Sequence, residues 1–230
     1  MKMNIHPYVI DGLVLYFDSR MNYRVDNGNL TKVYDWSGYG NHGTPHNGVK
    51  YIYDEEHGYA FYFDGVDDYV EVPDSPSLNF TVNNQLTVEA WVIDSVVDDT
   101  YRAIASKDGE FLLRRTNAGE GNDFEFFIYD GSSWEPRVDS GVVPERGKWY
   151  FVVGVFDGSE VKIYVNGELK RSKDRVATLS DTTNPLKIGM FNGGHRWNGV
   201  ITSIRIYNHA LNEDEIKLNY DSVKYGIGVL

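Results

Sequence analysis

The sequence predicts an all-β fold: an antiparallel β-sandwich of about ten to fourteen strands with one short C-terminal helix. The first reason is that apolar and polar residues alternate in several short stretches, which is the period of a strand. The second is that 14% of the residues are aromatic, a composition that favours strands. The third is that 23 glycines are available for the tight turns between strands.

The alternating stretches mark four strands in chain order. In residues 69–72 (YVEV) both valines can face one side, and residues 86–92 (LTVEAWV) place apolar side chains at the even positions. Residues 161–165 (VKIYV) and 204–207 (IRIY) repeat the pattern. Side chains two apart share one face of a strand, so each stretch can bury one face and expose the other.

The segment 149–167 predicts two successive hairpins. Residues 149–156 (WYFVVGVF) are nearly all apolar and predict a buried strand, which Asp157-Gly158 separates from the strand at 161–165. The following Asn166-Gly167 is a strong hairpin signal, because a type I′ turn needs positive φ at both positions. Residues 179–185 are polar and end in Pro, which predicts a loop leading into an apolar strand.

The C-terminal helix is predicted by its start signals. Asn212 can cap it, the acidic residues 213–215 favour the positive end of the helix dipole, and Ile216 and Leu218 begin an apolar face. No linker, low-complexity tract or shift in composition divides the chain. We therefore expect residues 1–230 to form a single domain.

Composition excludes several classes of function. With 22 Lys and Arg against 34 Asp and Glu, the formal net charge is −12, which argues against nucleic acid and anionic membrane surfaces as partners. The absence of cysteine excludes disulfides, thiolate zinc sites and cysteine nucleophiles. No apolar run has the length of a signal peptide or the roughly 20 residues of a membrane span, so we expect no membrane insertion. The localisation stays open.

Several local patterns occur in order along the chain. They are GLVLYFD at 12–18, DWSGYGNHG at 35–43, FYFDGVDDYV at 61–70, LTVEAWV at 86–92, WYFVVGVF at 149–156, VKIYVNG at 161–167 and NGVITSIRIYNHAL at 198–211. Together they resemble the laminin-G-like, or concanavalin A-like lectin/glucanase, superfamily over about residues 12–220. The resemblance implies a jelly roll of one concave and one convex sheet, often with a structural calcium ion and with a carbohydrate or protein ligand at the concave face or rim. The first two patterns also resemble stretches common in phage and archaeal-virus structural proteins.

The resemblance also implies a metal site. In relatives the calcium ion often lies between an Asp of the first strand, the Gly of a turn and an Asp of the last strand, which points to Asp18 and Gly65, and Asp67 lies in the same turn. Calcium binds about six to eight oxygens, and the turn DGVDD supplies three carboxylates. The third family position holds Thr202-Ser203 instead of an acid. The alternative is that the aspartates only cap a tight turn.

Loop residues are the candidates for binding a ligand. Trp134 lies in a loop bounded by Gly and Pro, and His195 and Arg196 follow a flexible Gly-Gly pair. The apolar face of a sugar stacks on aromatic rings while its hydroxyls bond to polar side chains, so these residues predict a carbohydrate site. Trp36 and Trp197 are instead expected to pack against or within the sandwich.

The sequence offers no convincing catalytic residues. A retaining glycosidase needs two carboxyl groups about 5–5.5 Å apart, and Glu125 stands between two phenylalanines with only Asp123 and Asp130 nearby. The serine-hydrolase elbow, the HExxH zinc motif and the P-loop are absent from the sequence. We therefore expect no catalytic site.

Three functions remain open. The first is a non-catalytic recognition module that binds carbohydrate or glycoprotein surfaces, with a calcium ion stiffening a loop. The second is a structural or assembly protein, such as a virion or cell-surface component, which uses the faces of the sandwich for self-association. The third is a glycoside hydrolase. A defined ligand pocket would favour the first function, and a large apolar surface would favour the second.

Overall fold

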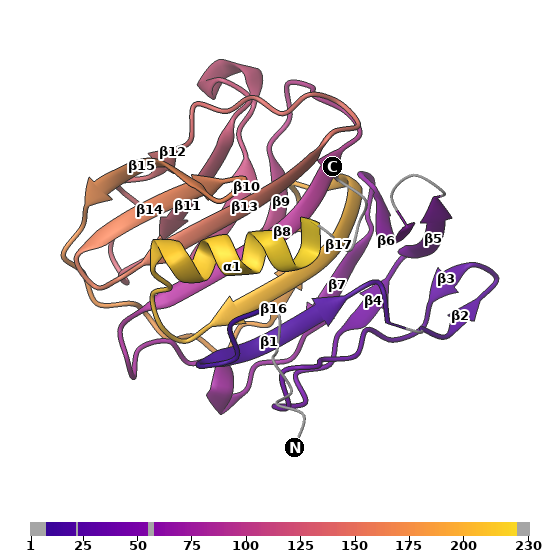
Figure 1. Cartoon of the computed structure of the whole chain (residues 1–230), viewed down its shortest axis with the longest axis horizontal. Coiled ribbons are helices and arrows are strands. Elements are labelled where there is room, and N and C mark those ends of the chain that lie inside the picture. The colour runs from indigo at the N-terminus through magenta and orange to yellow at the C-terminus, as the bar shows by residue number, and fades with distance from the viewer. Residues whose placement is uncertain (1–7, 22, 55–57, 225–230) are drawn as a thin grey trace.

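Two antiparallel β-sheets pack face to face (Figure 1). The structure is a computed structural model that describes residues 8–21, 23–54 and 58–224. One sheet has ten strands and the other has seven. This is the two-sheet sandwich that the alternating stretches and the resemblance predicted.

The ten-stranded sheet has the order β15-β14-β13-β8-β17-β6-β5-β3-β2, and β1 also pairs with β17. Its strands are β1 (Leu13–Asp18), β2 (Val25–Asp26), β3 (Asn29–Leu30), β5 (Lys50–Asp54), β6 (Gly58–Asp64), β8 (Leu86–Asp94), β13 (Trp149–Phe156), β14 (Glu160–Val165), β15 (Glu168–Asp174) and β17 (Asn198–Tyr207). The seven-stranded sheet has the order β12-β11-β10-β9-β16-β7-β4. Its strands are β4 (Thr44–His46), β7 (Tyr69–Val72), β9 (Arg102–Lys107), β10 (Phe111–Arg115), β11 (Phe124–Ile128), β12 (Val138–Asp139) and β16 (Leu186–Ile188). The helices are η1 (Pro76–Leu78) and η2 (Ala118–Glu120), both 3-10, and α1 (Glu213–Lys224).

The described residues form seventeen strands, where about ten to fourteen were expected. The excess consists of strands β2, β3, β4, β12 and β16, each of only two or three residues. So short a strand contains at most one cycle of alternation, which a sequence pattern cannot distinguish from a loop.

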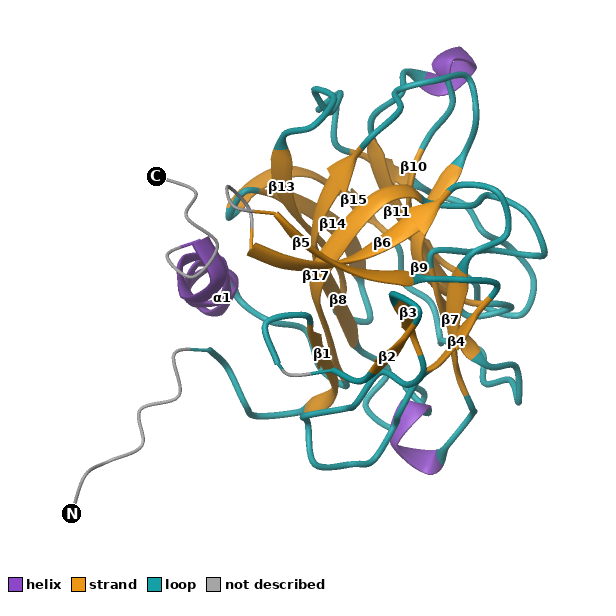
Figure 2. Cartoon of the chain, turned by 90° about the vertical axis from the view of Figure 1, so that its right-hand side faces the viewer, coloured by secondary structure: helices purple, strands orange, loops and turns teal. Residues whose placement is uncertain are grey.

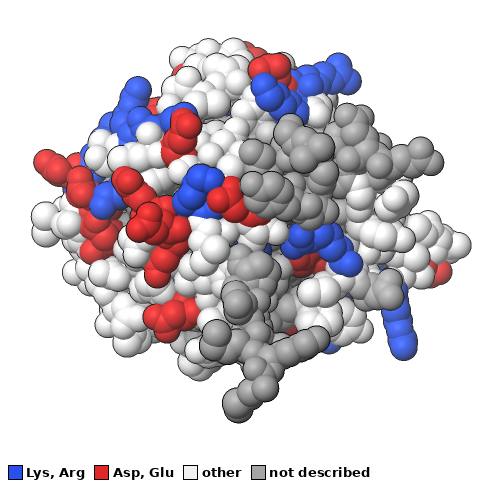
Figure 3. Space-filling view, viewed as in Figure 1, with Lys and Arg blue, Asp and Glu red and all other residues white. Residues whose placement is uncertain are grey.

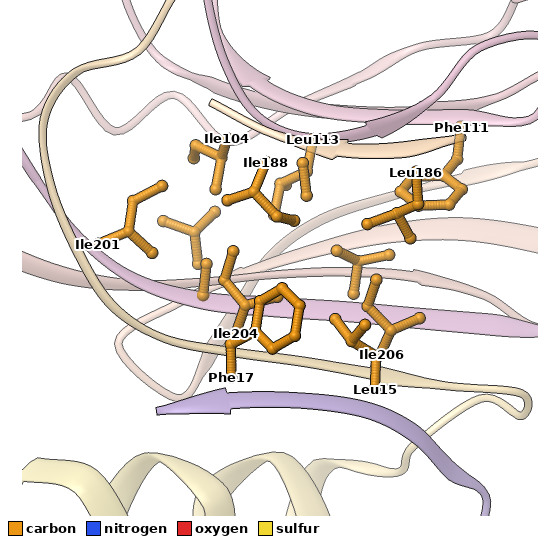
Figure 4. Close-up of a cluster of buried hydrophobic side chains, with 14 of the residues drawn as sticks. Leu15, Phe17, Ile104, Phe111, Leu113, Leu186, Ile188, Ile201, Ile204 and Ile206 are labelled. Atoms are coloured by element: carbon orange, nitrogen blue, oxygen red, sulfur yellow. The ribbon is translucent and has the colours of Figure 1, made fainter. Parts of the chain in front are cut away.

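The main core fills the space between the two sheets. Leu15 and Phe17 of β1 and Ile204 of β17 point from the ten-stranded sheet, and Ile104 and Leu186 point toward them from the seven-stranded sheet (Figure 4). All five side chains are at most 2% exposed. Because each Å² of buried apolar surface contributes about 25 cal/mol, this interior is the principal stabilising element of the fold.

Helix α1 covers the outer face of the ten-stranded sheet, away from the seven-stranded sheet (Figure 2). Its start is as predicted: Asn212 Oδ1 accepts a hydrogen bond from Glu215 N at 3.0 Å, and Glu215 Oε2 accepts one from Asn212 N at 2.9 Å. Ile216 is buried against the sheet, but Leu218 is 46% exposed, so the prediction for Leu218 was wrong. The inward face of the helix continues through Tyr220 instead.

Strand β8 is buried on both faces, although its alternation predicted one buried face. Val88 lies in the main core, whereas Trp91 stacks on Tyr220 of α1 with ring centroids 5.4 Å apart. Glu89, also on the helix side, pairs with Arg205 of β17 at 2.7 Å. The distant C-terminal helix covers this second face, and no local pattern within β8 reveals that cover.

One predicted turn and the predicted burial of two tryptophans can be compared with the structure. Asn166 and Gly167 have φ of 55° and 79°, as a type I′ turn between β14 and β15 requires. Trp197 is fully buried, as expected. Trp36 is 48% exposed, so the expectation that it packs against the sheet was wrong.

The surface carries mixed charge on the face that α1 occupies, where acidic and basic side chains lie next to one another (Figure 3). The edge strand β15 is also exposed and contains Glu168, Lys170 and Arg171. Charged edge strands oppose pairing with another sheet.

Candidate ligand-binding site

The outer face of the seven-stranded sheet carries a small apolar floor. Leu112 of β10 and Phe127 of β11 are direct cross-strand neighbours there, and Ala103 of β9 lies with them. Their neighbours along the strands, such as Leu113 and Phe126, face the main core. The half-buried rings of Trp134 and Phe191 pack against this floor from two loops.

The predicted residue Trp134 lines a pocket of about 560 Å³ on this floor. Its ring centroid lies 4.6 Å from that of Tyr129 and 5.4 Å from that of Phe127. The loop is held by Asp130, whose Oδ1 accepts hydrogen bonds from the backbone N–H groups of Ser132 and Ser133. The tryptophan is therefore fixed with part of its ring exposed, which suits stacking against a ligand.

His195, the second predicted residue, belongs to the same surface. Phe191 connects it to Trp134, because the Phe191 ring centroid lies 6.0 Å from Trp134 and 5.7 Å from His195. Tyr101 extends the row, 5.0 Å beyond His195. Burial, with a smaller contribution from the charge of Arg114, lowers the pKa of His195. The row of Trp134, Phe191, His195 and Tyr101 joins loops that are distant in sequence.

Arg196, the third predicted residue, turns to the other side of its loop. Its guanidinium lies over the Tyr69 ring at 5.3 Å and donates hydrogen bonds to the carbonyls of Asp67 and Gly193. The structure thus brings Trp134 and His195 into one aromatic row and places Arg196 beside the turn at residues 64–68.

A second, ionic pocket of about 290 Å³ adjoins the first. It is lined by Glu120, Glu125, Glu135, Arg137, Asp139 and Lys173. Glu125 is 2% exposed, and its Oε2 accepts a hydrogen bond from Arg114 Nε at 2.6 Å. Burial raises the pKa of Glu125 to about 7, although the charge and hydrogen bond of Arg114 oppose the increase.

Along the chain Glu125 has few acidic neighbours, which is why its sequence context predicted no catalytic pair. The structure supplies the missing neighbours from other elements: Asp139 of β12 is its cross-strand partner, and Glu135 lines the same pocket. One signal was available, since Glu125 and Phe127 are two apart on a strand and must share a face.

Three aspartates form the acidic group in the described chain that could hold a metal ion. Asp64, Asp67 and Asp68 each place one carboxylate oxygen within 4.8 Å of the others. Asp68 is 3% exposed; its Oδ2 accepts a hydrogen bond from Asp64 N, and its Oδ1 has no hydrogen-bond partner among the described residues. Burial raises the pKa of Asp68, and the charges of Asp64 and Asp67 add to the effect. A cation at this turn would compensate the buried charge.

Asp18, predicted as a metal ligand from the resemblance, lies far from this turn. It pairs with Ser203 on β17, whereas Asp64 pairs with Asn198, so roughly 17 Å of strand separates them. Its carboxylate binds Arg20 at 2.5 Å. Burial alone would raise the pKa of Asp18, but the hydrogen bonds and charge of Arg20 lower it overall.

Gly65 stands at the turn itself, with a φ of 79°. Its carbonyl accepts a hydrogen bond of 3.4 Å from Arg102, and a Cβ at this position would lie 2.6 Å from the Asn198 side chain. Of the three predicted ligands, Asp67 and Gly65 therefore share the turn at residues 64–68, and Asp18 does not reach it.

The fold defines a class of protein that sequence comparison also identifies. Residues 63–217 match the concanavalin A-like lectin/glucanases superfamily, and the chain belongs to this family. No curated protein has a sequence that matches the chain. Among the described residues, no helix combines the length and apolar character needed to cross a membrane.

Solved structures share this fold at low sequence identity. Domain 4 of AbnA, a GH43 extracellular arabinanase from Geobacillus stearothermophilus solved in complex with arabinotriose, is 20% identical with a TM-score of 0.64, covering 89% of this chain and 96% of that one. The binding domain of botulinum neurotoxin DC in complex with rat synaptotagmin II is 15% identical with a TM-score of 0.71, covering 94% of this chain and 53% of that one. The chain thus spans about half the length of the toxin domain.

Proposed function

We propose that the chain is a single-domain, non-catalytic recognition module that binds carbohydrate, free or on a glycoprotein, at the aromatic row beside Trp134. The observation that carries this proposal is a half-buried tryptophan fixed in a pocket of about 560 Å³, which four aromatic and four polar residues line. Pockets of this size and character are typical small-ligand sites. A sugar ring would stack on Trp134 while its hydroxyls bond to Ser132, Glu135 or Arg137.

The structural neighbours support this assignment. Arabinotriose is bound in the crystal of the arabinanase domain, whose fold covers nearly the whole of this chain. Another structure with a similar fold is of botulinum neurotoxin type C, whose cell entry depends on interaction with two ganglioside molecules. Arabinotriose and gangliosides both contain saccharides. Assembly through sheet edges receives less support, because the edge strand β15 is charged.

Glycoside hydrolysis is the second candidate, and one observation favours it. Glu125, with a pKa raised to about 7 by burial, shares the ionic pocket with Glu135, whose pKa is lowered by Arg137 against the effect of burial. Paired carboxyl groups with divergent pKa values are the pattern of an acid and a nucleophile or base. Against this, both groups are bound by arginines, at 2.6 Å for Glu125 and Arg114 and 2.7 Å for Glu135 and Arg137.

We test these functions with a glycan-array screen followed by calorimetry on the saccharides that bind. Trp134→Ala should weaken binding more than tenfold because it removes the stacking surface. Trp36→Ala is the control, since Trp36 is an exposed tryptophan on another loop, and it should bind as wild type does. Absence of binding to every glycan, or equal binding by Trp134→Ala, would refute the assignment. Appearance of new reducing ends would favour hydrolysis.

We also propose that calcium is the ion suited to the turn of Asp64, Asp67 and Asp68. Carboxylate oxygens are its preferred ligands, and Asp68 Oδ1 is a buried acceptor to which no residue in the described ranges donates. Calcium at about a hundred times its Kd should stabilise the fold by about 2.7 kcal/mol, seen as a raised Tm. Asp68→Asn should abolish this response, and Asp18→Asn should leave it intact. A Tm that calcium does not change would refute the site.

A further inference from the structure

We propose that the ionic pocket is a second subsite of the same binding surface, and that it selects uncharged, hydroxyl-bearing saccharides over anionic ones. The inference rests on the proposed carbohydrate-binding function and specifies its ligand class. Glu135 and Arg137 line both pockets, so the ionic pocket begins where the aromatic pocket ends. A ligand stacked on Trp134 would extend into it with its next sugar unit.

The charges of the ionic pocket disfavour an anion. Four of its six lining residues are acidic, and its two cations already have partners. Arg137 binds Glu135 at 2.7 Å and lies 3.7 Å from Glu120. Lys173 lies 3.6 Å from Asp139 and donates a hydrogen bond to the Arg137 carbonyl. A carboxylate, sulfate or sialic acid entering here would meet an excess of negative charge and no free cation among these lining residues.

The same pocket contains carboxylate oxygens that lack short hydrogen bonds from the described residues. Glu125 uses Oε2 to bind Arg114, but its Oε1 lies 4.0 Å from the nearest Arg137 nitrogen and receives no hydrogen bond from the described residues. Within the described ranges, Asp139 forms only long ion pairs, of 3.6 Å to Lys173 and 3.9 Å to Arg171. Hydroxyl groups of a sugar would supply the missing donors, and hydrogen bonds to charged acceptors are the strong ones.

The protonation of Glu125 further separates hydroxyl from ammonium ligands. The charged groups that act on it are Arg114 of β10, Arg137, and Asp139 of β12. Burial, to which the charge of Asp139 adds, outweighs the two arginines and raises its pKa to about 7. A hydroxyl can donate to the carboxylate or accept from the acid, so it fits both forms. An ammonium group fits only the ionised form. Binding of a neutral saccharide should therefore change little between pH 5.5 and 8 (about threefold or less).

The test measures affinity for a panel of defined probes by calorimetry. The neutral probes are arabinotriose, xylotriose, maltotriose and lactose, and the anionic probes are trigalacturonic acid and 3′-sialyllactose. We expect one or more neutral probes to bind at least tenfold more tightly than any anionic probe. Glu125→Ala should weaken the neutral probe about ten- to a hundredfold, and Glu125→Gln should reduce the discrimination against anions.

Two further variants complete the test. Asp139→Asn changes a partly exposed acid of the same pocket and serves where Glu125→Ala does not fold; it too should weaken the neutral probe. Glu145→Gln, an exposed acid paired with Lys148 outside both pockets, is the control and should bind as wild type does. Anionic probes that bind as tightly as neutral ones, or neutral binding unchanged by Glu125→Ala and Asp139→Asn, would overturn this inference and leave the carbohydrate-binding function intact. No binding by any probe would overturn both.

Discussion

Glu125 gives the sharpest prediction, because its burial links the ionic pocket to the pH dependence of folding. The perturbation is Glu125→Gln, which keeps the shape of the side chain and removes its titration. In the folded chain the pKa of Glu125 is about 7, against an ordinary value of 4.5. The folded state therefore binds the proton more tightly than the unfolded state does, and the free energy of unfolding falls as the pH rises from 4.5 to 7.

The magnitude follows from the size of the shift. Each pKa unit corresponds to about 1.36 kcal/mol, so the carboxyl group contributes about 3 kcal/mol of stability below pH 4.5 that is lost by pH 7. The amide of Glu125→Gln is neutral throughout this range. Relative to wild type, the variant should gain about 3 kcal/mol in unfolding free energy between pH 4.5 and 7.5.

The assay is urea unfolding at four pH values between 4.5 and 7.5, with tryptophan fluorescence as the signal. The quantity compared is the difference in unfolding free energy between variant and wild type at each pH, so that other titrating groups cancel. Glu145→Gln is the control, since that side chain is exposed and its difference should not change with pH. A flat or falling difference for Glu125→Gln would refute the reasoning that burial dominates over Arg114.

Three predictions concern the fold and use the same unfolding assay. Glu89→Ala removes the partner that lies 2.7 Å from the buried Arg205, so it should lower the free energy of unfolding by about 3–5 kcal/mol. Replacing both residues by Met should recover most of this loss. If the double variant is no more stable than Glu89→Ala, the ion pair is not the cause. Gly154→Ala places a Cβ 2.2 Å from the Phe126 ring and should cost about 1–3 kcal/mol, so an unchanged urea midpoint would contradict the packing between β11 and β13. Asn212→Ala removes the α1 cap and should cost about 1 kcal/mol, most of which Asn212→Ser should restore.

Local rules were enough for the longer strands, for one hairpin turn and for the cap of the helix. Alternation located β7, β8, β14 and the end of β17, and the Asn166-Gly167 turn adopts the positive φ values that its sequence requires. Asn212 caps α1 as its spacing from Glu215 indicated. Each of these depends on residues a few positions apart, so their physical cause is contained in the local sequence.

The tertiary structure decided how the candidate site is assembled. Trp134 and His195 were identified separately, but Phe191 and Tyr101, which complete the row, carry no local sign of a binding role. Glu125 looked isolated until the pairing of β11 with β12 placed Asp139 opposite it. These neighbours come from strand pairing across long stretches of chain, which sequence periodicity does not encode.

The candidate metal site shows the same division between local and tertiary information. The three carboxylates of the turn DGVDD are visible in the sequence, and in the structure one oxygen of each lies within 4.8 Å of the others. Whether Asp18 could join them depended on the register of β1 and β6 against β17. This register places Asp18 and Asp64 roughly five residues apart along β17. Composition and periodicity determine which residues form strands and turns, because those preferences are local. Register, burial and the resulting pKa values arise only when distant strands meet, because desolvation and Coulomb interactions depend on distance in space.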